Sequence, residues 1–178
     1  TPEANYTVAS TPLRMAAADL DGAGLQDIAM TDYLLFSVSV LLNQGDGTFG
    51  KAVDYKVGAN PKGIAAADLD GDARIDLTTA NTSSSSVSVL RNQGGGRFDG
   101  DPPSIGVPEQ AVALVPLDVD GDSDPDLAVA GGQDCIWILH NDGKGNFALS
   151  GTLHAGQVPT DVAAGDLDGI GCMDLVSA

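Results

Sequence analysis

The chain has 178 residues, of which 25 are Asp or Glu and 8 are Lys or Arg, so its formal net charge is −17. A surface this acidic repels phosphate backbones and anionic lipids, which argues against nucleic-acid and membrane-surface partners. The longest apolar run, near 33–42, is interrupted by Ser and too short to cross a bilayer, so we expect no membrane insertion.

The first predicted element is a strand over residues 4–10. Tyr6 in this strand precedes Tyr55 by 49 residues, and an acidic nine-residue loop recurs four times with advances of 49, 50 and 48 residues. One structural unit of about fifty residues is therefore repeated, and residues 4–10 are the outer strand of a preceding unit. The predicted units lie at 13–57, 62–107, 111–155 and, in part, 160–178.

Each complete unit predicts four short antiparallel strands. The second unit has an inner strand of small residues at 63–67, an acidic loop and a strand at 76–81. A Ser-rich turn, a strand at 87–91, a Gly-rich hairpin and an outer strand ending near Val107 complete it. Four strands per period of about fifty residues is the pattern of a β-propeller blade.

The sequence thus predicts an all-β fold, a single propeller segment over 1–178 with about 3.5 four-stranded blades. Propellers usually close with roughly 4 to 8 blades, because an open ring leaves strand edges and apolar faces exposed. The chain is therefore either a fragment of a larger propeller or a unit that self-associates to complete the ring.

The acidic loop between the first two strands of each blade predicts a metal site. Carboxylates at loop positions 1, 3, 5 and 9 repel one another unless a cation lies among them. Oxygen ligands without a nearby His or Cys favour Ca²⁺, and a Gly at position 4 lets the chain turn tightly around the ion. The predicted carboxylate ligands are Asp19, Asp21 and Asp27; Asp68, Asp70, Asp72 and Asp76; Asp118, Asp120, Asp122 and Asp126; and Asp166, Asp168 and Asp174. By analogy with the EF-hand loop, position 7 is expected to offer a backbone carbonyl, from Leu25, Arg74, Asp124 and Cys172.

The four loops are not equivalent. Those beginning at Asp68 and Asp118 have a carboxylate at every expected position, whereas Ala23 and Ile170 remove the position-5 ligand from the first and last. We predict two strong calcium sites and two that are weaker or empty. The alternative, that all four are only acidic surface turns, is disfavoured by four copies at one spacing.

A Gly-rich hairpin repeats with the same period, at Asn43–Phe49, Asn92–Phe98 and Asn141–Phe147. Each lies between two apolar strands. Its Phe is expected to pack between neighbouring blades, and stacking on a sugar is the alternative.

The segment Ala-Ala-Asp-Leu-Asp-Gly-Asp at 66–72, followed by the hairpin at 92–98, resembles the FG-GAP/VCBS repeat family. That family is similar to the integrin α-subunit propeller, whose calcium loops join the first and second strands of a blade on the lower rim. The resemblance implies the same fold and calcium loops here. Besides the missing position-5 ligands, the departures are Ala73 and Ser123, where the family usually has Gly.

No catalytic constellation is visible. His140 stands at a strand end where its counterparts are Leu42 and Arg91, and His154 is expected to be a solvated surface residue. The Ser run at 83–86 lacks a Gly-x-Ser-x-Gly elbow, and a carboxylate committed to calcium cannot serve as a glycosidase acid or base. We predict that this chain is not an enzyme.

The predicted function is a calcium-binding, non-catalytic adhesion or binding module with a protein or glycan ligand. Its binding surface would be the upper-rim loops, and its setting extracellular, cell-surface or periplasmic, where calcium is plentiful. The expected upper-rim loops are Thr31–Leu35, Asn81–Ser86 and Gly131–Asp134. The alternatives are an accessory portion of a secreted polysaccharide-active enzyme and a structural spacer of a large surface protein.

Overall fold

The computed structural model describes residues 5–8, 11–132, 134–171 and 173–178, and the regular structure of these residues is all β. Three four-stranded antiparallel sheets are followed by a two-stranded one. Blade 1 holds β1 (Pro12–Ala18), β2 (Asp27–Asp32), β3 (Ser37–Leu41) and β4 (Val53–Lys56). Blade 2 holds β5 (Pro61–Ala67), β6 (Asp76–Asn81), β7 (Ser86–Leu90) and β8 (Ser104–Gly106). Blade 3 holds β9 (Ala111–Leu117), β10 (Asp126–Gly131), β11 (Cys135–Asn141) and β12 (Phe147–His154), and the partial blade 4 holds β13 (Val162–Gly165) and β14 (Asp174–Ser177).

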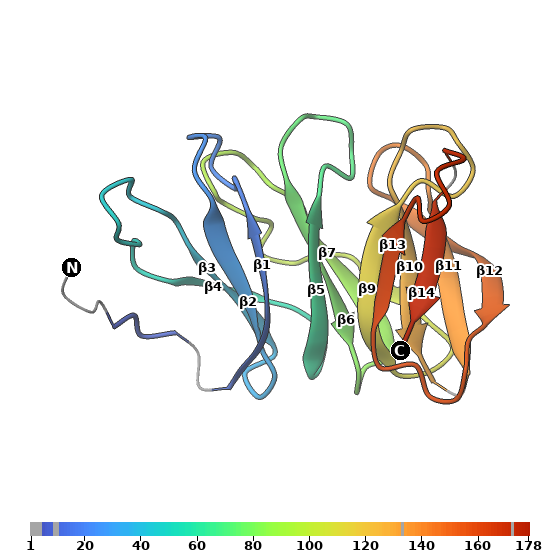
Figure 1. The fold of residues 1–178 in the computed structure, drawn as a ribbon. Helices are drawn as coiled ribbons and strands as arrows, with labels where there is room; N and C mark the ends of the chain where they lie inside the picture. Colours follow the sequence, from blue (N-terminus) through green and yellow to red (C-terminus); the bar gives the residue numbers. More distant parts are fainter. Residues whose placement is uncertain (1–4, 9–10, 133, 172) are drawn as a thin grey trace.

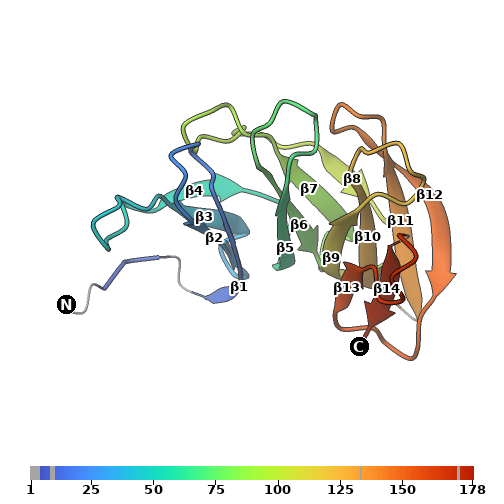
Figure 2. The ribbon, with the colours of Figure 1, turned by 45° about the horizontal axis from the view of Figure 1, so that its top comes forward.

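The blades stand side by side in an open arc, with the first strand of each on the inside (Figures 1 and 2). This arrangement confirms the predicted all-β propeller fold. None of the described segments forms a helix that could span a membrane.

Small residues let the inner strands β5 and β9 approach each other closely. A Cβ added at Gly63 would lie 2.9 Å from Ala113 Cα and 3.2 Å from the carbonyl oxygen of Val112. Only a residue without a side chain fits there without moving a neighbouring backbone. The crowding expected at the centre of a propeller thus accounts for Gly63 in the small-residue strand β5.

The middle strands of blade 2 are completely buried because a blade covers each of their faces. Along β7, Val87 packs with the residues of blade 3, and Leu90 packs with those of blade 1. The alternating Ser residues of this strand are also buried, and they are hydrogen-bonded: Asn81 Nδ2 donates to Ser88 Oγ (2.9 Å) and Ser86 Oγ (3.3 Å). Hydrogen bonding makes the burial of these polar groups tolerable.

The Phe of each Gly-rich hairpin packs against a neighbouring repeat, as predicted. Phe98 of blade 2 is buried among residues of blades 1 and 2, and its ring meets Tyr55 edge-on with centroids 5.4 Å apart. Phe49 meets Tyr6 in the same way at 5.7 Å. Tyr6 therefore takes the place of Tyr55 one repeat earlier, although residues 5–8 of the expected strand at 4–10 form no strand. None of the described strands pairs with residues 5–8, and residues 4, 9 and 10 lie outside the described part.

In blades 2 and 3, the Asn that opens the Gly-rich hairpin links its blade to the preceding one. Asn92 Nδ2 of blade 2 donates to the carbonyl of Leu20 in blade 1 (2.8 Å) and to that of Ile75 (2.9 Å). Asn141 makes the equivalent bonds to Leu69 and Pro125. Because Asn92 and Asn141 are buried, these bonds fix the position of one blade relative to the next.

Replacing Asn92 by Ala should destabilise the fold by about 2–4 kcal/mol, because it leaves the buried carbonyl of Leu20 and the partly buried carbonyl of Ile75 without this donor. Asn43→Ala is the matched control, since Asn43 Nδ2 has one bond, to the exposed carbonyl of Gln26, and should cost under about 1 kcal/mol. Urea denaturation of both variants measures the difference. Equal losses for the two would contradict a role of Asn92 in joining blades.

Candidate metal centre

The four acidic loops, numbered 1 to 4 at 19–27, 68–76, 118–126 and 166–174, lie at one rim of the arc, at the top in Figure 1. Each folds around its first Asp. In loop 2, Asp68 Oδ1 accepts a hydrogen bond from Gly71 N (2.9 Å), and Oδ2 accepts one from Ala73 N (2.9 Å). Asp19, Asp118 and Asp166 accept the equivalent pairs.

The two N–H groups that donate to the first Asp in all four loops belong to loop positions 4 and 6. They point towards its carboxylate because both positions have positive φ. In loop 2 the φ angles are 75° at Gly71 and 67° at Ala73, and Ser123 at position 6 of loop 3 has 76°. A left-handed conformation costs a residue with a Cβ about 1–2 kcal/mol. Ala73 and Ser123 therefore keep the shape of the loop at some cost in stability.

The last Asp of loops 1, 2 and 3 anchors the loop to the rest of its blade. Asp76 is 1% exposed; its Oδ2 accepts from Leu69 N (3.1 Å) and its Oδ1 from Asn92 N (2.7 Å). Asp27 and Asp126 make the same pairs of bonds. One carboxylate thus joins the loop, the second strand and the Gly-rich hairpin, and each oxygen keeps a lone pair that a cation could use.

Three predicted ligands come together in each loop, with one ligand atom from each residue and all of these atoms within 4.8 Å of one another. Positions 1, 3 and 9 meet in loops 1, 2 and 4, and positions 1, 3 and 5 meet in loop 3. The groups are Asp19, Asp21 and Asp27; Asp68, Asp70 and Asp76; Asp118, Asp120 and Asp122; and Asp166, Asp168 and Asp174. Asp126 belongs to a second group in loop 3, with Asp120 and His140.

The structure does not bring every predicted residue into these groups. Asp72, at position 5 of loop 2, forms an ion pair with the guanidinium of Arg74, whose Nε donates to the carbonyl of Asn92 (2.8 Å). Asp124 is in none of the groups found among the described residues, and Cys172 lies outside them. Loops 1 and 4, without a position-5 carboxylate, still assemble three acidic side chains. The ranking into two strong and two weak sites therefore stays a prediction.

Two carboxylates of loop 2, Asp70 and Asp76, are incompletely compensated by their protein neighbours. Asp70 Oδ1 is buried and has no hydrogen-bond partner. Burial and the negative charge of Asp72 raise the pKa of Asp70, and burial, with smaller contributions from Asp70 and Asp72, raises the pKa of Asp76 to about 6. A divalent cation would supply both the missing partner of Asp70 and the missing charge. The residues of loop 2 thus fit an oxygen-ligated cation such as Ca²⁺.

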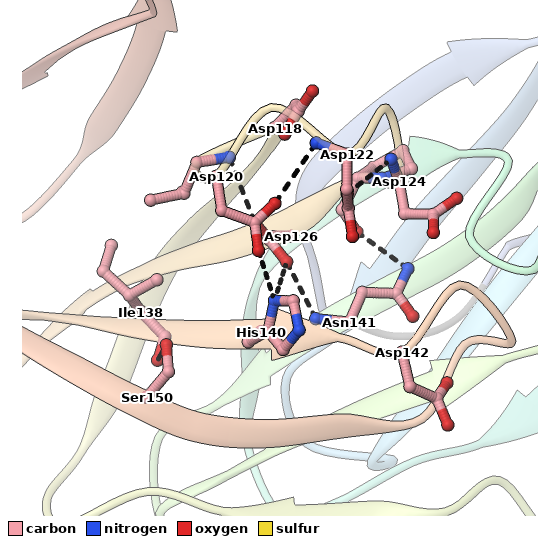
Figure 3. Close-up of polar contacts among 12 residues, drawn as sticks. Asp118, Asp120, Asp122, Asp124, Asp126, Ile138, His140, Asn141, Asp142 and Ser150 are labelled. Atoms are coloured by element: carbon pink, nitrogen blue, oxygen red, sulfur yellow. Dashed lines mark hydrogen bonds and ion pairs between the residues drawn. The ribbon is translucent and has the colours of Figure 1, made fainter.

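Sequence reasoning missed His140. We expected His140 only to end a strand, at a position that varies between repeats. Its Nδ1 lies 3.2 Å from Asp126 Oδ1 and 3.4 Å from Asp120 Oδ2, at loop 3 of its own blade (Figure 3). The register of the sheet places position 140 beside the loop, because Asn141 N donates to Asp126. The repeat alignment held no such signal, since the counterparts Leu42 and Arg91 are not metal ligands.

A family model described as FG-GAP-like repeat matches the chain three times, over residues 19–79, 68–129 and 118–177. Each match runs from one acidic loop into the next blade. No curated protein matches the chain.

Solved structures with this fold include BBS1N in complex with ARL6DN, at 19% identity and a TM-score of 0.61 in a lead-soaked crystal. A mercury-soaked crystal of the same complex matches at 15% identity with a TM-score of 0.64. The V. cholerae biofilm matrix protein Bap1 matches at 22% identity with a TM-score of 0.57. The matches cover 100%, 97% and 94% of this chain, but only 53%, 49% and 23% of the others. The chain thus spans about half of BBS1N and about a quarter of Bap1.

Calcium binding to loop 2 should weaken as the pH falls below about 6. The pKa of Asp76 in the folded chain, about 6, lies above the unfolded value of about 3.9, so protonation of Asp76 stabilises the metal-free fold as the pH falls from 6 towards 4. Calcium requires the ionised carboxylate and competes with that proton. Titration calorimetry at about pH 7.5, 6 and 5 should show calcium affinity falling by up to about tenfold in total. Most of this fall should occur between about pH 6 and 5. Affinity that stays level down to about pH 5 would contradict this competition.

Proposed function

We propose that this chain, which belongs to the FG-GAP-like repeat family, is a calcium-stabilised, non-catalytic propeller module. It presents a second rim, the one opposite the acidic loops, to a protein or glycan ligand. We place it in an extracellular, cell-surface or periplasmic setting, where calcium reaches the millimolar level that exposed loops of this kind need. The acidic loops would hold the blades in place, and the opposite rim would carry the binding surface.

The observation that carries the calcium proposal is the buried, unpartnered oxygen of Asp70 within the group of Asp68, Asp70 and Asp76. An unpaired buried carboxylate oxygen is costly, and a hard cation with oxygen ligands removes that cost. Ca²⁺ suits the site better than Mg²⁺, because it tolerates irregular geometry and more protein ligands. When bound, it would offset most of the negative charge of these three carboxylates and tie the first two strands of the blade together.

The second rim, at the ends of β2, β6 and β10, differs from blade to blade. Blade 1 has Tyr33-Leu34-Leu35-Phe36 in its β2–β3 hairpin, and Leu34, Leu35 and Phe36 are 58%, 47% and 40% exposed. Blade 2 has Thr82-Ser83-Ser84-Ser85 at the same hairpin. The hairpin therefore does not need apolar residues, and their exposure in blade 1 supports a contact surface.

Phe36 strengthens this reading. Its φ is 55°, a left-handed conformation that is unusual for an aromatic residue, and Ser85 in blade 2 has 47°. The turn demands this conformation in both blades, yet neither blade has Gly there. A hollow of about 500 Å³ lies beside this hairpin, lined by Pro12, Leu13 and Tyr33 with Thr11, Lys62 and Thr82. We propose the Tyr33–Phe36 hairpin and this hollow as the ligand-contacting part of the rim; of the expected loop Gly131–Asp134, residue 133 lies outside the described part.

A protein ligand is the favoured partner. The solved BBS1N propeller of similar fold was crystallised with a protein, ARL6DN. Because Bap1, of similar fold, is a biofilm matrix protein, a matrix component or glycan is the second candidate ligand.

Calcium should raise the melting temperature of the chain, and Asp70→Asn should reduce that gain. Saturation to about ten times the dissociation constant contributes about 1.4 kcal/mol per site, or roughly 3–6 °C for a chain of this size. Asp101→Asn, outside the acidic loops, is the control and should keep the full gain. Differential scanning calorimetry with EGTA and then with excess Ca²⁺ provides the readout. Melting that is indifferent to calcium would rule out the calcium proposal.

Ligand binding should depend on the apolar hairpin of blade 1. The double change Leu34→Ser and Leu35→Ser copies the polar hairpin of blade 2, so it should leave the melting temperature within about 2 °C while lowering ligand affinity at least about tenfold. A glycan array and a displayed random-peptide library, both probed with calcium-loaded protein, identify the ligand on which affinity is then measured. Ser83→Ala on blade 2 is the control. No selective ligand in either screen would favour a structural spacer.

A further inference from the structure

His140 gives loop 3 a nitrogen donor at its carboxylate group. Its Nδ1 lies 3.2 Å from Asp126 Oδ1 and 3.4 Å from Asp120 Oδ2, which are the carboxylates of positions 9 and 3 (Figure 3). In the described part of the chain, the groups in loops 1, 2 and 4 contain only Asp. Loop 3 is therefore chemically different from the other three.

The position of His140 does not oblige its side chain to face the loop. Its counterparts lie against the Gly-rich hairpin of the next blade: Leu42 fills the space where a Cβ at Gly96 would stand, and Arg91 donates to the Lys144 carbonyl (2.9 Å) and Asn146 Oδ1 (3.0 Å). Blade 4 is described only as β13 and β14, so no such hairpin lies beside His140, and its ring contacts the acidic loop of its own blade.

The geometry around His140 suits a shared metal ion. Neighbouring ligand atoms on a metal with bonds of about 2.1 Å are separated by about 3.0 Å in octahedral and about 3.4 Å in tetrahedral geometry. The observed separations of 3.2 and 3.4 Å fall in this range. Asp126 is held in place by Asn141 N (2.8 Å) and Val119 N (3.0 Å), the kind of outer support that orients a ligating carboxylate.

The ligand set also selects the type of ion. Ca²⁺ takes oxygen ligands, whereas Zn²⁺ and related cations readily accept an imidazole nitrogen beside carboxylates. His140 is 42% exposed and Asp120 is 48% exposed, so an ion can enter from solvent and water can complete its coordination.

We propose that loop 3, for which the sequence predicts a strong calcium site, instead prefers a nitrogen-accepting divalent cation of the Zn²⁺ type. This ion would be bound through His140 Nδ1, Asp120 and Asp126, while the all-oxygen loops take Ca²⁺. This inference rests on the proposed metal-binding function of the loops. It makes His140 the residue that decides which ion loop 3 prefers.

Zinc titration of the metal-free chain, followed by NMR of the histidine rings, tests the proposal. The sequence has two histidines, so His154 serves as an internal control. About one equivalent of Zn²⁺ should shift the ring signals of His140 and leave those of His154 unchanged. His140→Leu, which copies Leu42, should weaken zinc binding by at least about tenfold and change calcium affinity by less than about threefold. His140→Gln, which keeps a polar side chain, should behave the same way.

Two results would overturn the proposal: a His140 ring unaffected by zinc, or zinc affinity equal in the wild-type chain and both variants. Either would mean that His140 only forms ion pairs with the loop. Calcium titration of the same samples separates this failure from that of the calcium proposal. Calcium binding without a His140-dependent zinc site refutes only the present inference, whereas absence of calcium binding refutes the function proposed above.

Discussion

A buried carboxylate at the end of acidic loops 1, 2 and 3 holds each of the three complete blades together. In blade 2, Asp76 accepts hydrogen bonds from the loop at Leu69 N and from the hairpin at Asn92 N, while the Asn92 side chain reaches the preceding blade at Leu20. Blades 1 and 3 repeat the carboxylate contacts. Because these groups are buried, losing one partner leaves the others unsatisfied, so loop, hairpin and neighbouring blade depend on one another.

The same carboxylates concentrate negative charge at one rim. Backbone N–H groups donate hydrogen bonds to both carboxylate oxygens of Asp68 and Asp76. Asp70 Oδ1, in contrast, has no partner, and the pKa of Asp76 is raised to about 6. A cation at this point would relieve the electrostatic cost and stabilise the contacts between strands. The opposite rim carries none of these constraints, which frees the Tyr33–Phe36 hairpin to differ from its serine-rich counterpart in blade 2.

The period of about fifty residues was enough to predict the blades, because a repeated strand pattern constrains the fold many times over. The strand at 76–81 and the packing of Phe98 between blades follow directly from it. The expected strand over 4–10 does not form in residues 5–8, although Tyr6 occupies its repeat position. Strand formation depends on a pairing partner, and a local pattern cannot supply one.

Composition and spacing therefore determined the all-β class, the propeller repeat and which carboxylates share a loop, since these depend on contacts within one unit. Tertiary structure decided which side chains meet: Asp72 pairs with Arg74 instead of joining Asp68, Asp70 and Asp76, and His140 turns towards Asp120 and Asp126. These outcomes depend on side-chain directions and on strands brought together by sheet pairing. A repeat alignment records neither, because it compares equivalent positions and not neighbouring ones.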